Sequence, residues 1–222
     1  MTEYNVILAN GEFPTHSYPL KLIKNAKSII CTDGSADKLI KIGYKANIII
    51  GDMDSLDISI VEIKKNMIPD DNQNNSDLEK ALIYYLENFK NEQLFVLGAT
   101  GLRDDHNFTN MLLLNKFSSE LSVSLVTNYY KIIVNKGKNI YPSQPNQQIS
   151  ILPLKKINQI STEGLKYELK KTSLSSDSRG ISNIALNNEF MIESSDNVFV
   201  FLELWFNELF KSYWDNWLWY FR

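Results

Sequence analysis

Short apolar runs alternate with helical patterns through the first half of the chain. The apolar runs are rich in β-branched residues and have the length of strands, so we expect strands at 4–9, 28–32, 47–50, 94–97 and 122–126. Between them the pattern predicts helices at 35–42, from 76 onward and around 108–117. Strands that alternate with helices are typical of a parallel sheet, and the first half therefore predicts an α/β domain.

The helix predicted after Ser76 has the clearest boundary signal. Ser76 and Glu79 have the spacing of a capping box, in which each side chain bonds a backbone N–H at the helix start. Apolar residues follow at helical spacing, at 78, 81, 82, 85, 86 and 89. The helix predicted at 35–42 is followed by Gly43, the residue type that commonly ends helices.

After about residue 128 the rhythm changes to short strand-like runs separated by turn residues. We expect strands at 131–135, 148–152, 164–169 and 198–202, without a long helical pattern until the end of the chain. The sequence therefore predicts an N-terminal parallel-sheet α/β (Rossmann-like) domain at 1–128 and a C-terminal all-β sandwich domain at 129–203.

A tail at 204–222 holds all four tryptophans. So many aromatic side chains need a partner surface, either the β domain or a second copy of the chain. An interfacial membrane contact is the alternative, but the acidic residues of the tail make a poor surface for anionic lipid.

The composition indicates a soluble globular protein. Of 222 residues, 44% are hydrophobic and 22% are charged, and the net charge of −3 creates no general attraction for nucleic acid. The single cysteine, Cys31, cannot form a disulfide within the chain, which fits a reducing compartment. The first residues show neither the basic segment nor the apolar stretch of a signal peptide. We therefore expect a cytoplasmic protein that binds neither nucleic acid nor a membrane.

Charge is distributed unevenly along the chain. Residues 51–79 contain eight acids and two lysines, whereas residues 131–183 contain nine bases and three acids. The first stretch would attract cations, and the second is more compatible with anionic ligands.

Polar clusters follow the predicted strands of the first half. They are Asn10-Gly11, Asp33-Gly34, Gly51-Asp52-Met53-Asp54-Ser55 and a glycine-rich segment at 98–101 that leads to Arg103. In a parallel sheet these positions share the carboxyl edge, where ligands bind. Asp33, Asp52, Asp54 and Asp77 would gather there, and so many carboxylates need a cation. Mg²⁺ fits best because no His/Cys cluster supports a transition metal.

A magnesium site of this kind indicates phosphoryl or nucleotidyl transfer. The chain has no phosphate-loop motif and no protein-kinase signature, so a different scaffold is required. An acidic turn whose Asp side chains only cap backbone N–H groups is the alternative for Asp52 and Asp54.

Four motifs, in this order and spacing, resemble the thiamine pyrophosphokinase (thiamin diphosphokinase) family. They are Asp33-Gly34-Ser35-Ala36, Gly51-Asp52-Met53-Asp54-Ser55, Ser76-Asp77-Leu78-Glu79-Lys80-Ala81-Leu82, and Gly98 to His106 with Asn110. Segments at 149–154, 162–167 and 178–183 are similar to the C-terminal domain of the family. The resemblance implies transfer of the pyrophosphoryl group of ATP to the thiamine hydroxyl, giving thiamine diphosphate and AMP. It also implies a homodimer with active sites between its subunits.

The resemblance implies roles for particular residues. Asp52, Asp54 and Asp77 would hold Mg²⁺, and Asp33 would complete the catalytic acidic cluster. ATP would be bound by Asn10, Ser55, Gln73, Arg103, Asp105 and His106, and thiamine by Ser182 and Asn183. Taken without the resemblance, Asp77 could serve only the helix dipole, Arg103 could pair with Asp104 or Asp105, and 180–183 could be a plain turn.

One departure and two rival functions stay open. Asn72 stands where the family commonly has a carboxylate, so either Asp71 replaces it or the site has one negative charge fewer. Another magnesium-dependent nucleotidyl or sugar transferase would also use an Asp-x-Asp sequence, but it would not explain the motif from Arg103 to Asn110. A catalytically silent nucleotide- or thiamine-binding module is the second rival.

Overall fold

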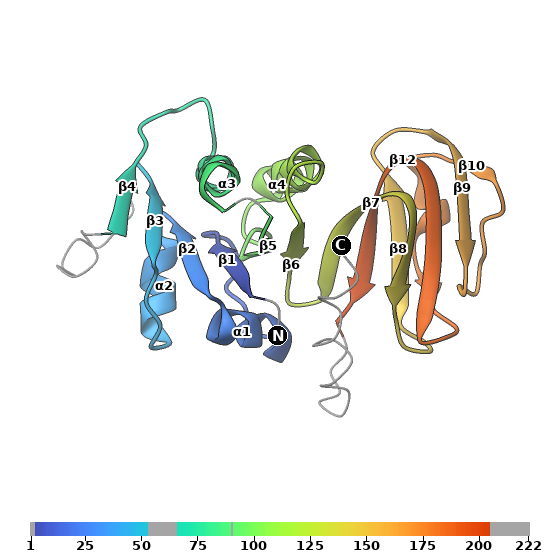
Figure 1. Ribbon diagram of the computed structural model, residues 1–222, viewed down its shortest axis with the longest axis horizontal. Helices are drawn as coiled ribbons and strands as arrows, with labels where there is room; N and C mark the ends of the chain where they lie inside the picture. Colours follow the sequence, from blue (N-terminus) through green and yellow to red (C-terminus); the bar gives the residue numbers. More distant parts are fainter. Residues whose placement is uncertain (1–2, 53–65, 90, 205–222) are drawn as a thin grey trace. The chain divides into compact units, whose positions relative to one another are not determined.

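The computed structural model describes residues 3–52, 66–89 and 91–204, which form two compact units, 3–128 and 129–204 (Figure 1). Asp54, Ser55 and the tail at 205–222 lie outside the described residues. In the described part of the chain, every helix is too short or too polar to cross a membrane.

The unit at 3–128 is built on a parallel sheet, as the sequence predicts. Its strands are β1 (Tyr4–Leu8), β2 (Ser28–Thr32), β3 (Ile48–Gly51), β4 (Met67–Pro69), β5 (Gln93–Leu97) and β6 (Val123–Val126). They lie in the order β6-β5-β1-β2-β3-β4, and every neighbouring pair is parallel. The apolar runs are buried because helices cover both faces of such a sheet. β4 is not predicted, since it has three residues and ends in proline.

In the described residues, four helices connect these strands. They are α1 (Ser17–Asn25), α2 (Ser35–Lys41), α3 (Asp77–Asn88) and α4 (Asp104–Phe117). Figure 1 shows α1 and α2 on one face of the sheet and α3 and α4 on the other. The Ser76 half of the predicted capping box is confirmed, because the Ser76 hydroxyl accepts the Glu79 N–H at 3.3 Å. The Glu79 carboxylate bonds the Lys116 ammonium at 2.7 Å.

The first helix is missing from the sequence prediction. The segment around His16 reads as a loop because prolines flank it, yet α1 begins at the next residue. The His16 Nδ1 caps the helix by accepting the Tyr18 N–H at 3.1 Å. Pro19 lies in the first turn of α1, where a missing N–H costs no intrahelical bond.

The unit at 129–204 is antiparallel and is organised by one long pair of strands. Its strands are β7 (Tyr130–Pro142), β8 (Gln148–Pro153), β9 (Ile157–Glu163), β10 (Thr172–Leu174), β11 (Asn183–Ile184) and β12 (Glu189–Glu203). β12 pairs with β7 along its length. Its other edge pairs with β9 at 191–194 and with β8 at 198–202. The β7–β12 pair thus belongs to two sheets, and the predicted all-β sandwich is confirmed.

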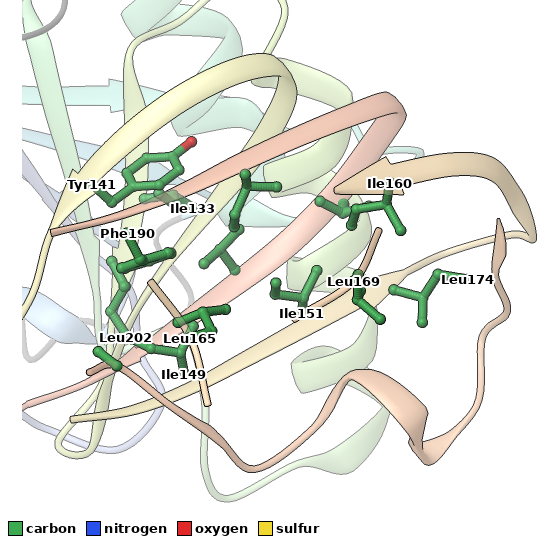
Figure 2. Close-up of a cluster of buried hydrophobic side chains, with 14 of the residues drawn as sticks. Ile133, Tyr141, Ile149, Ile151, Ile160, Leu165, Leu169, Leu174, Phe190 and Leu202 are labelled. Atoms are coloured by element: carbon green, nitrogen blue, oxygen red, sulfur yellow. The ribbon is translucent and has the colours of Figure 1, made fainter. Parts of the chain in front are cut away.

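The two sheets enclose the core of this unit (Figure 2). Phe190 and Ile192 come from the first half of β12, and Val198, Val200 and Leu202 come from its second half. The change of sheet coincides with a register shift between Ser194 and Val198, opposite Gly137, whose φ is +73°. Glycine adopts a positive φ of this size without strain because it has no Cβ.

A buried polar group accompanies the bend in the β7–β12 pair. Asn135 is 1% exposed, and its Oδ1 accepts the Tyr141 hydroxyl at 2.6 Å and the Asn139 amide at 2.9 Å. Its Nδ2 donates to the Ser194 Oγ at 2.9 Å. The amide therefore links both strands at the bend with its hydrogen-bonding capacity used.

The predicted strand at 164–169 is wrong. The strand is β9, which ends at Glu163, and Gly164 with φ +79° turns the chain. The Thr162 N–H and hydroxyl bond the Leu169 carbonyl and N–H at 2.8 and 2.9 Å, so the segment folds back on β9. The apolar residues of this segment alternate as in a strand, but the pattern arises because Leu165 and Leu169 are buried in the core.

Candidate active site

The order of the parallel strands reverses at the β1–β5 pair, and in open α/β sheets ligands bind at the carboxyl ends of the strands beside such a reversal. The loops after these two strands lie side by side. The Gly11 N–H donates to the Gly98 carbonyl at 2.7 Å, and the Glu12 N–H donates to the Thr100 carbonyl at 2.8 Å. A Cβ at Gly11 would lie 2.5 Å from the Gly98 oxygen, so this approach requires glycine.

Asn10 belongs to this edge and is exposed. A Cβ at Gly34 would lie 2.4 Å from the Asn10 Nδ2, so the Asn10 amide lies over the residue that follows Asp33. The Lys38 ammonium donates to the Asn10 and Gly11 carbonyls at 3.1 and 2.9 Å. These contacts connect the loop after β1 with the loop after β2.

Arg103, Asp105 and His106 meet at the start of α4. The Arg103 Nε and Nη2 donate to the two Asp105 carboxylate oxygens at 3.1 and 2.6 Å, and Asp105 Oδ1 also accepts the His106 N–H at 3.0 Å. These bonds, the Arg103 bond first, lower the pKa of Asp105 to about 2. The Arg103–Asp105 ion pair, one alternative left by the sequence, is therefore present. The start of a 14-residue helix also favours anions.

Asn110 fixes the neighbouring glycine-rich loop. Its side chain is buried, and its Nδ2 donates to the Ala99 carbonyl at 2.7 Å. The loop between β5 and α4 is thus held to the second turn of α4, which gives a structural reason for an asparagine at this position of the motif.

Asp33 and Asp52 lie at the ends of adjacent strands. The Asp33 N–H donates to the Ile50 carbonyl at 3.0 Å, and a Cβ at Gly51 would lie 2.6 Å from the Asp33 Cβ. Asp33 is therefore next to the residue that precedes Asp52. Asp33 is buried, whereas Asp52 is partly exposed.

The loop at 70–76 brings Gln73 and Asp77 to the same end of the sheet. The Asp70 N–H donates to the Gly51 carbonyl at 2.9 Å, and the Gln73 Nε2 lies 3.5 Å from Asp52 Oδ2. The Lys80 ammonium contacts the Asp70 carbonyl at 2.7 Å and Asp77 Oδ1 at 3.4 Å. Asp77 is therefore connected to the end of β3 through Lys80 and Asp70.

Asn72 has a local role within this loop. Its N–H donates to Asp70 Oδ1, and its own Oδ1 accepts the Asn74 N–H, both at 2.9 Å. An asparagine suits such a turn because its side chain can replace a backbone acceptor. Asn72, at the position where the thiamine pyrophosphokinase family commonly has a carboxylate, thus helps to hold the turns of this loop.

The predicted site residues of this unit therefore fall into two groups. Asp33, Asp52, Gln73 and Asp77 lie around the ends of β2 and β3, with Asn10 over Gly34 beside them. Arg103, Asp105 and His106 lie together at the start of α4. Among the described residues, no three His, Cys, Asp or Glu side chains are close enough to hold a metal ion by themselves. Asp52 and Asp77 still offer the oxygen donors that Mg²⁺ prefers, since this ion commonly uses one or two carboxylates and completes its shell with phosphate and water.

Ser182 and Asn183 lie in the other unit, in and before β11. The Asn183 side chain is buried, donates to the Tyr167 carbonyl at 2.8 Å and accepts the Tyr167 N–H at 3.0 Å. Ser182 is exposed with φ +57°, and its N–H donates to the Ser150 Oγ at 3.0 Å. Asn183 thus fixes the backbone of Tyr167, while the Ser182 side chain faces outward.

Sequence reasoning gives no role to Lys38 or Lys80, although both contact the loops of the site. Lys80 has a signal in its spacing, because a residue three positions after Asp77 lies on the same face of a helix. Lys38 has no such signal, since its partners are backbone carbonyls of a loop 28 and 27 residues away.

Two models of one protein family match consecutive stretches of the chain. Thiamin pyrophosphokinase, catalytic domain, matches residues 20–126, and Thiamin pyrophosphokinase, vitamin B1 binding domain, matches residues 131–199. Thiamine pyrophosphokinase 1 of Oryza sativa subsp. japonica is 27% identical over 78% of this chain and 76% of its own. Thiamine pyrophosphokinase 1 of Arabidopsis thaliana is 24% identical over 89% of this chain and 85% of its own.

Solved structures have the same fold. Thiamine pyrophosphokinase from Bacillus subtilis superimposes with a TM-score of 0.78 at 20% identity, covering 90% of this chain and 98% of that one. Yeast thiamin pyrophosphokinase superimposes with a TM-score of 0.77 at 20% identity, covering 94% of this chain and 89% of that one. Because the catalytic and vitamin B1-binding models both match it, the chain belongs to the thiamin pyrophosphokinase family.

Proposed function

We propose that the chain is a thiamine pyrophosphokinase that transfers the terminal pyrophosphoryl group of ATP to the hydroxyl of thiamine. The products are thiamine diphosphate and AMP. The observation that carries this proposal is that the loops after β5, β1, β2 and β3 contact one another in turn at one edge of the parallel sheet. These loops carry the acids that suit a divalent cation and lead to Arg103 at the start of α4. The two family matches agree with it.

Asp52, Asp54 and Asp77 would hold the Mg²⁺ that the family generally uses. When bound, this ion neutralises charge on the phosphate oxygens as the transfer proceeds. Of these carboxylates, Asp52 lies at the end of β3, next to the strand that leads to Asp33. The loop at 70–76 supports them through Gln73, whose amide lies against Asp52.

Arg103 and the start of α4 would bind the phosphates, together with Asn10, Ser55, Gln73 and His106. Asp105 holds Arg103 through Nε and Nη2, which leaves the Nη1 side of the guanidinium for a phosphate oxygen. Asp105 thus orients the cation that contacts ATP. Such binding would raise the rate by positioning the ATP phosphates, because the protein contributes little covalent chemistry to phosphoryl transfer.

The transfer forms a bond between the thiamine hydroxyl oxygen and the β-phosphorus, and it breaks the bond between that phosphorus and the oxygen retained by AMP. A site carboxylate accepts the proton of the hydroxyl. Asp33, Asp52, Asp54 and Asp77 are the candidates for this base.

We assign ATP binding to residues 1–128 and thiamine binding to residues 129–203, where Ser182 and Asn183 would contact thiamine. The second family match, a vitamin B1 binding domain, supports this division. Within the pair, the exposed Ser182 is the better candidate for direct contact, and Asn183 would act by fixing Tyr167. We further propose a homodimer with active sites between subunits and a cytoplasmic location, where the buried thiol of Cys31 stays reduced.

An assay of AMP release in the presence and absence of thiamine and Mg²⁺ tests the proposal. AMP that requires both supports a thiamine pyrophosphokinase. A nucleotidyl or sugar transferase would give no thiamine-dependent AMP, and a silent binding module would give no AMP at all. Asp54→Asn should nearly abolish turnover while the protein remains folded by circular dichroism; unchanged turnover would remove Asp54 from the metal site.

A further inference from the structure

Lys80 occupies an unusual place for a lysine. It lies in the first turns of α3, and only 3% of its side chain is exposed. Long side chains in a helix point back toward its N-terminus, so the stem of Lys80 carries the ammonium to the loop before α3. There the Nζ lies 2.7 Å from the Asp70 carbonyl oxygen and 3.4 Å from Asp77 Oδ1.

Two general effects oppose a cation at this position. The positive end of the helix dipole repels an ammonium group, and burial removes the hydration of a charge. A charged lysine is stable at this position only if its partners compensate for the helix dipole and for the lost hydration. The Asp70 carbonyl and the Asp77 carboxylate are such partners, and both belong to segments that we assign to the active site.

The contacts of Lys80 connect the end of β3 with the start of α3. Asp70, whose carbonyl accepts from Lys80, donates its own N–H to the Gly51 carbonyl, and Gly51 precedes Asp52. Gln73 of the same loop lies against Asp52. The ammonium group therefore links Asp77 to the segment that carries Asp52.

We propose that Lys80 is a positioning residue for pyrophosphoryl transfer: its ammonium group fixes the Asp77 carboxylate and the loop at 70–76 in the arrangement that receives MgATP. Lys80 acts through Asp77 and the loop and does not contact the transferred group. The inference rests on the proposed function, since it assigns Asp77 and Gln73 to the site for ATP and its metal ion.

Two substitutions separate the contacts of Lys80. Lys80→Met keeps the apolar stem and removes both bonds, and the Asp77 carboxylate that loses its partner is 38% exposed, so water can replace the ammonium group there. Lys80→Gln keeps a donor for the Asp70 carbonyl but loses the charge beside Asp77. We expect both variants to unfold near the wild-type urea midpoint and to lose turnover on the order of 10²-fold, because displacement by about 1 Å in such a site has this effect.

A double-mutant cycle shows whether Lys80 acts through Asp77. The affinity of the protein for a non-hydrolysable ATP analogue with Mg²⁺ is measured by calorimetry for wild type, Lys80→Gln, Asp77→Asn and the double variant. We expect Lys80→Gln to weaken binding about tenfold in the wild-type background and by less than about twofold when Asp77 is already replaced. Equal losses in both backgrounds would overturn the proposal.

Lys116→Met is the matched control. It removes the cation that pairs with Glu79, also in the first turn of α3, but on an exposed side chain. We expect wild-type turnover and affinity from this variant. Folded Lys80→Met and Lys80→Gln proteins with wild-type turnover would refute a positioning role. A wild-type protein that forms no thiamine-dependent AMP would instead refute the proposed function itself.

Discussion

The two units of the chain use sheets in different ways. In the unit at 3–128, each short parallel strand ends in a polar loop, and the loops converge at one edge because all the strands point in the same direction. In the unit at 129–204, the strands are antiparallel, and one bent pair, β7–β12, joins two sheets around an apolar core. The first arrangement brings charged side chains to one edge, whereas the second encloses a packed apolar core.

This difference predicts that function and stability respond to mutation in different places. A charge removed from the parallel edge should affect catalysis more than folding. A methyl group removed from the sandwich core should affect folding first.

The largest effect is expected from Asp52→Asn. It removes a carboxylate assigned to the metal site, and turnover in the AMP-release assay should fall by about 10²–10³-fold, the scale of losing one preorganised electrostatic contact. The free energy of unfolding in urea should change by less than about 1 kcal/mol. Glu87→Gln, the same charge change at an exposed position of α3, serves as control. A variant with wild-type turnover would show that the edge does not gather the reacting charges.

Truncation in the sandwich core should give the second effect. Ile160 on β9 is fully buried, so Ile160→Ala should lower the free energy of unfolding by about 2–5 kcal/mol through lost burial and a cavity. Ile140→Ala makes the same truncation at a side chain that is 55% exposed and should cost less than about 1 kcal/mol. Urea titration of the three proteins checks this. Similar losses at both positions would contradict a core localised between the two sheets.

A third effect concerns a buried charge and is seen only when the pH changes. Burial lowers the pKa of Lys131 on β7 to about 7, from an unfolded value of about 10.4. Between these values the unfolded chain binds more protons than the folded one, so the wild-type protein should gain stability as the pH rises from 7 toward 10. The gain is absent below pH 7, where both states are protonated.

Lys131→Met tests this dependence. The variant should lack this gain, so the difference in free energy of unfolding between wild type and variant should shift toward the wild type from pH 7 to pH 9. Urea titrations at both pH values measure it. Parallel curves for the two proteins would mean that Lys131 keeps its ordinary pKa.

The parallel unit could be predicted well because its signals are local. Ser76 specifies the start of α3, and the acids follow strands whose apolar runs are continuous. The contact of Asp33 with Gly51 follows once those strands are taken as neighbours. The strand order itself, and with it the reversal between β1 and β5, depends on pairings that no local pattern encodes.

The antiparallel unit could be predicted only in part. The expected strands at 131–135 and 198–202 are the apolar halves of β7 and β12. The other halves contain Gly137 and several polar residues, so they read as turns, and only pairing between strands distant in sequence makes them continuous. The role of Asn183 is equally hidden, because its partner Tyr167 is 16 residues away.

The bend at Asn135 and Ser194 has a consequence for how the molecule forms during synthesis. β12 lies in the middle of both sheets, yet it is the last described strand to leave the ribosome. Strands β7 to β11 therefore cannot complete their pairing until β12 is synthesised. Every described strand of the parallel unit, in contrast, has been made by residue 126. Because pairing over long sequence separations is slow, the nascent chain should carry a finished parallel unit while the antiparallel unit is still incomplete.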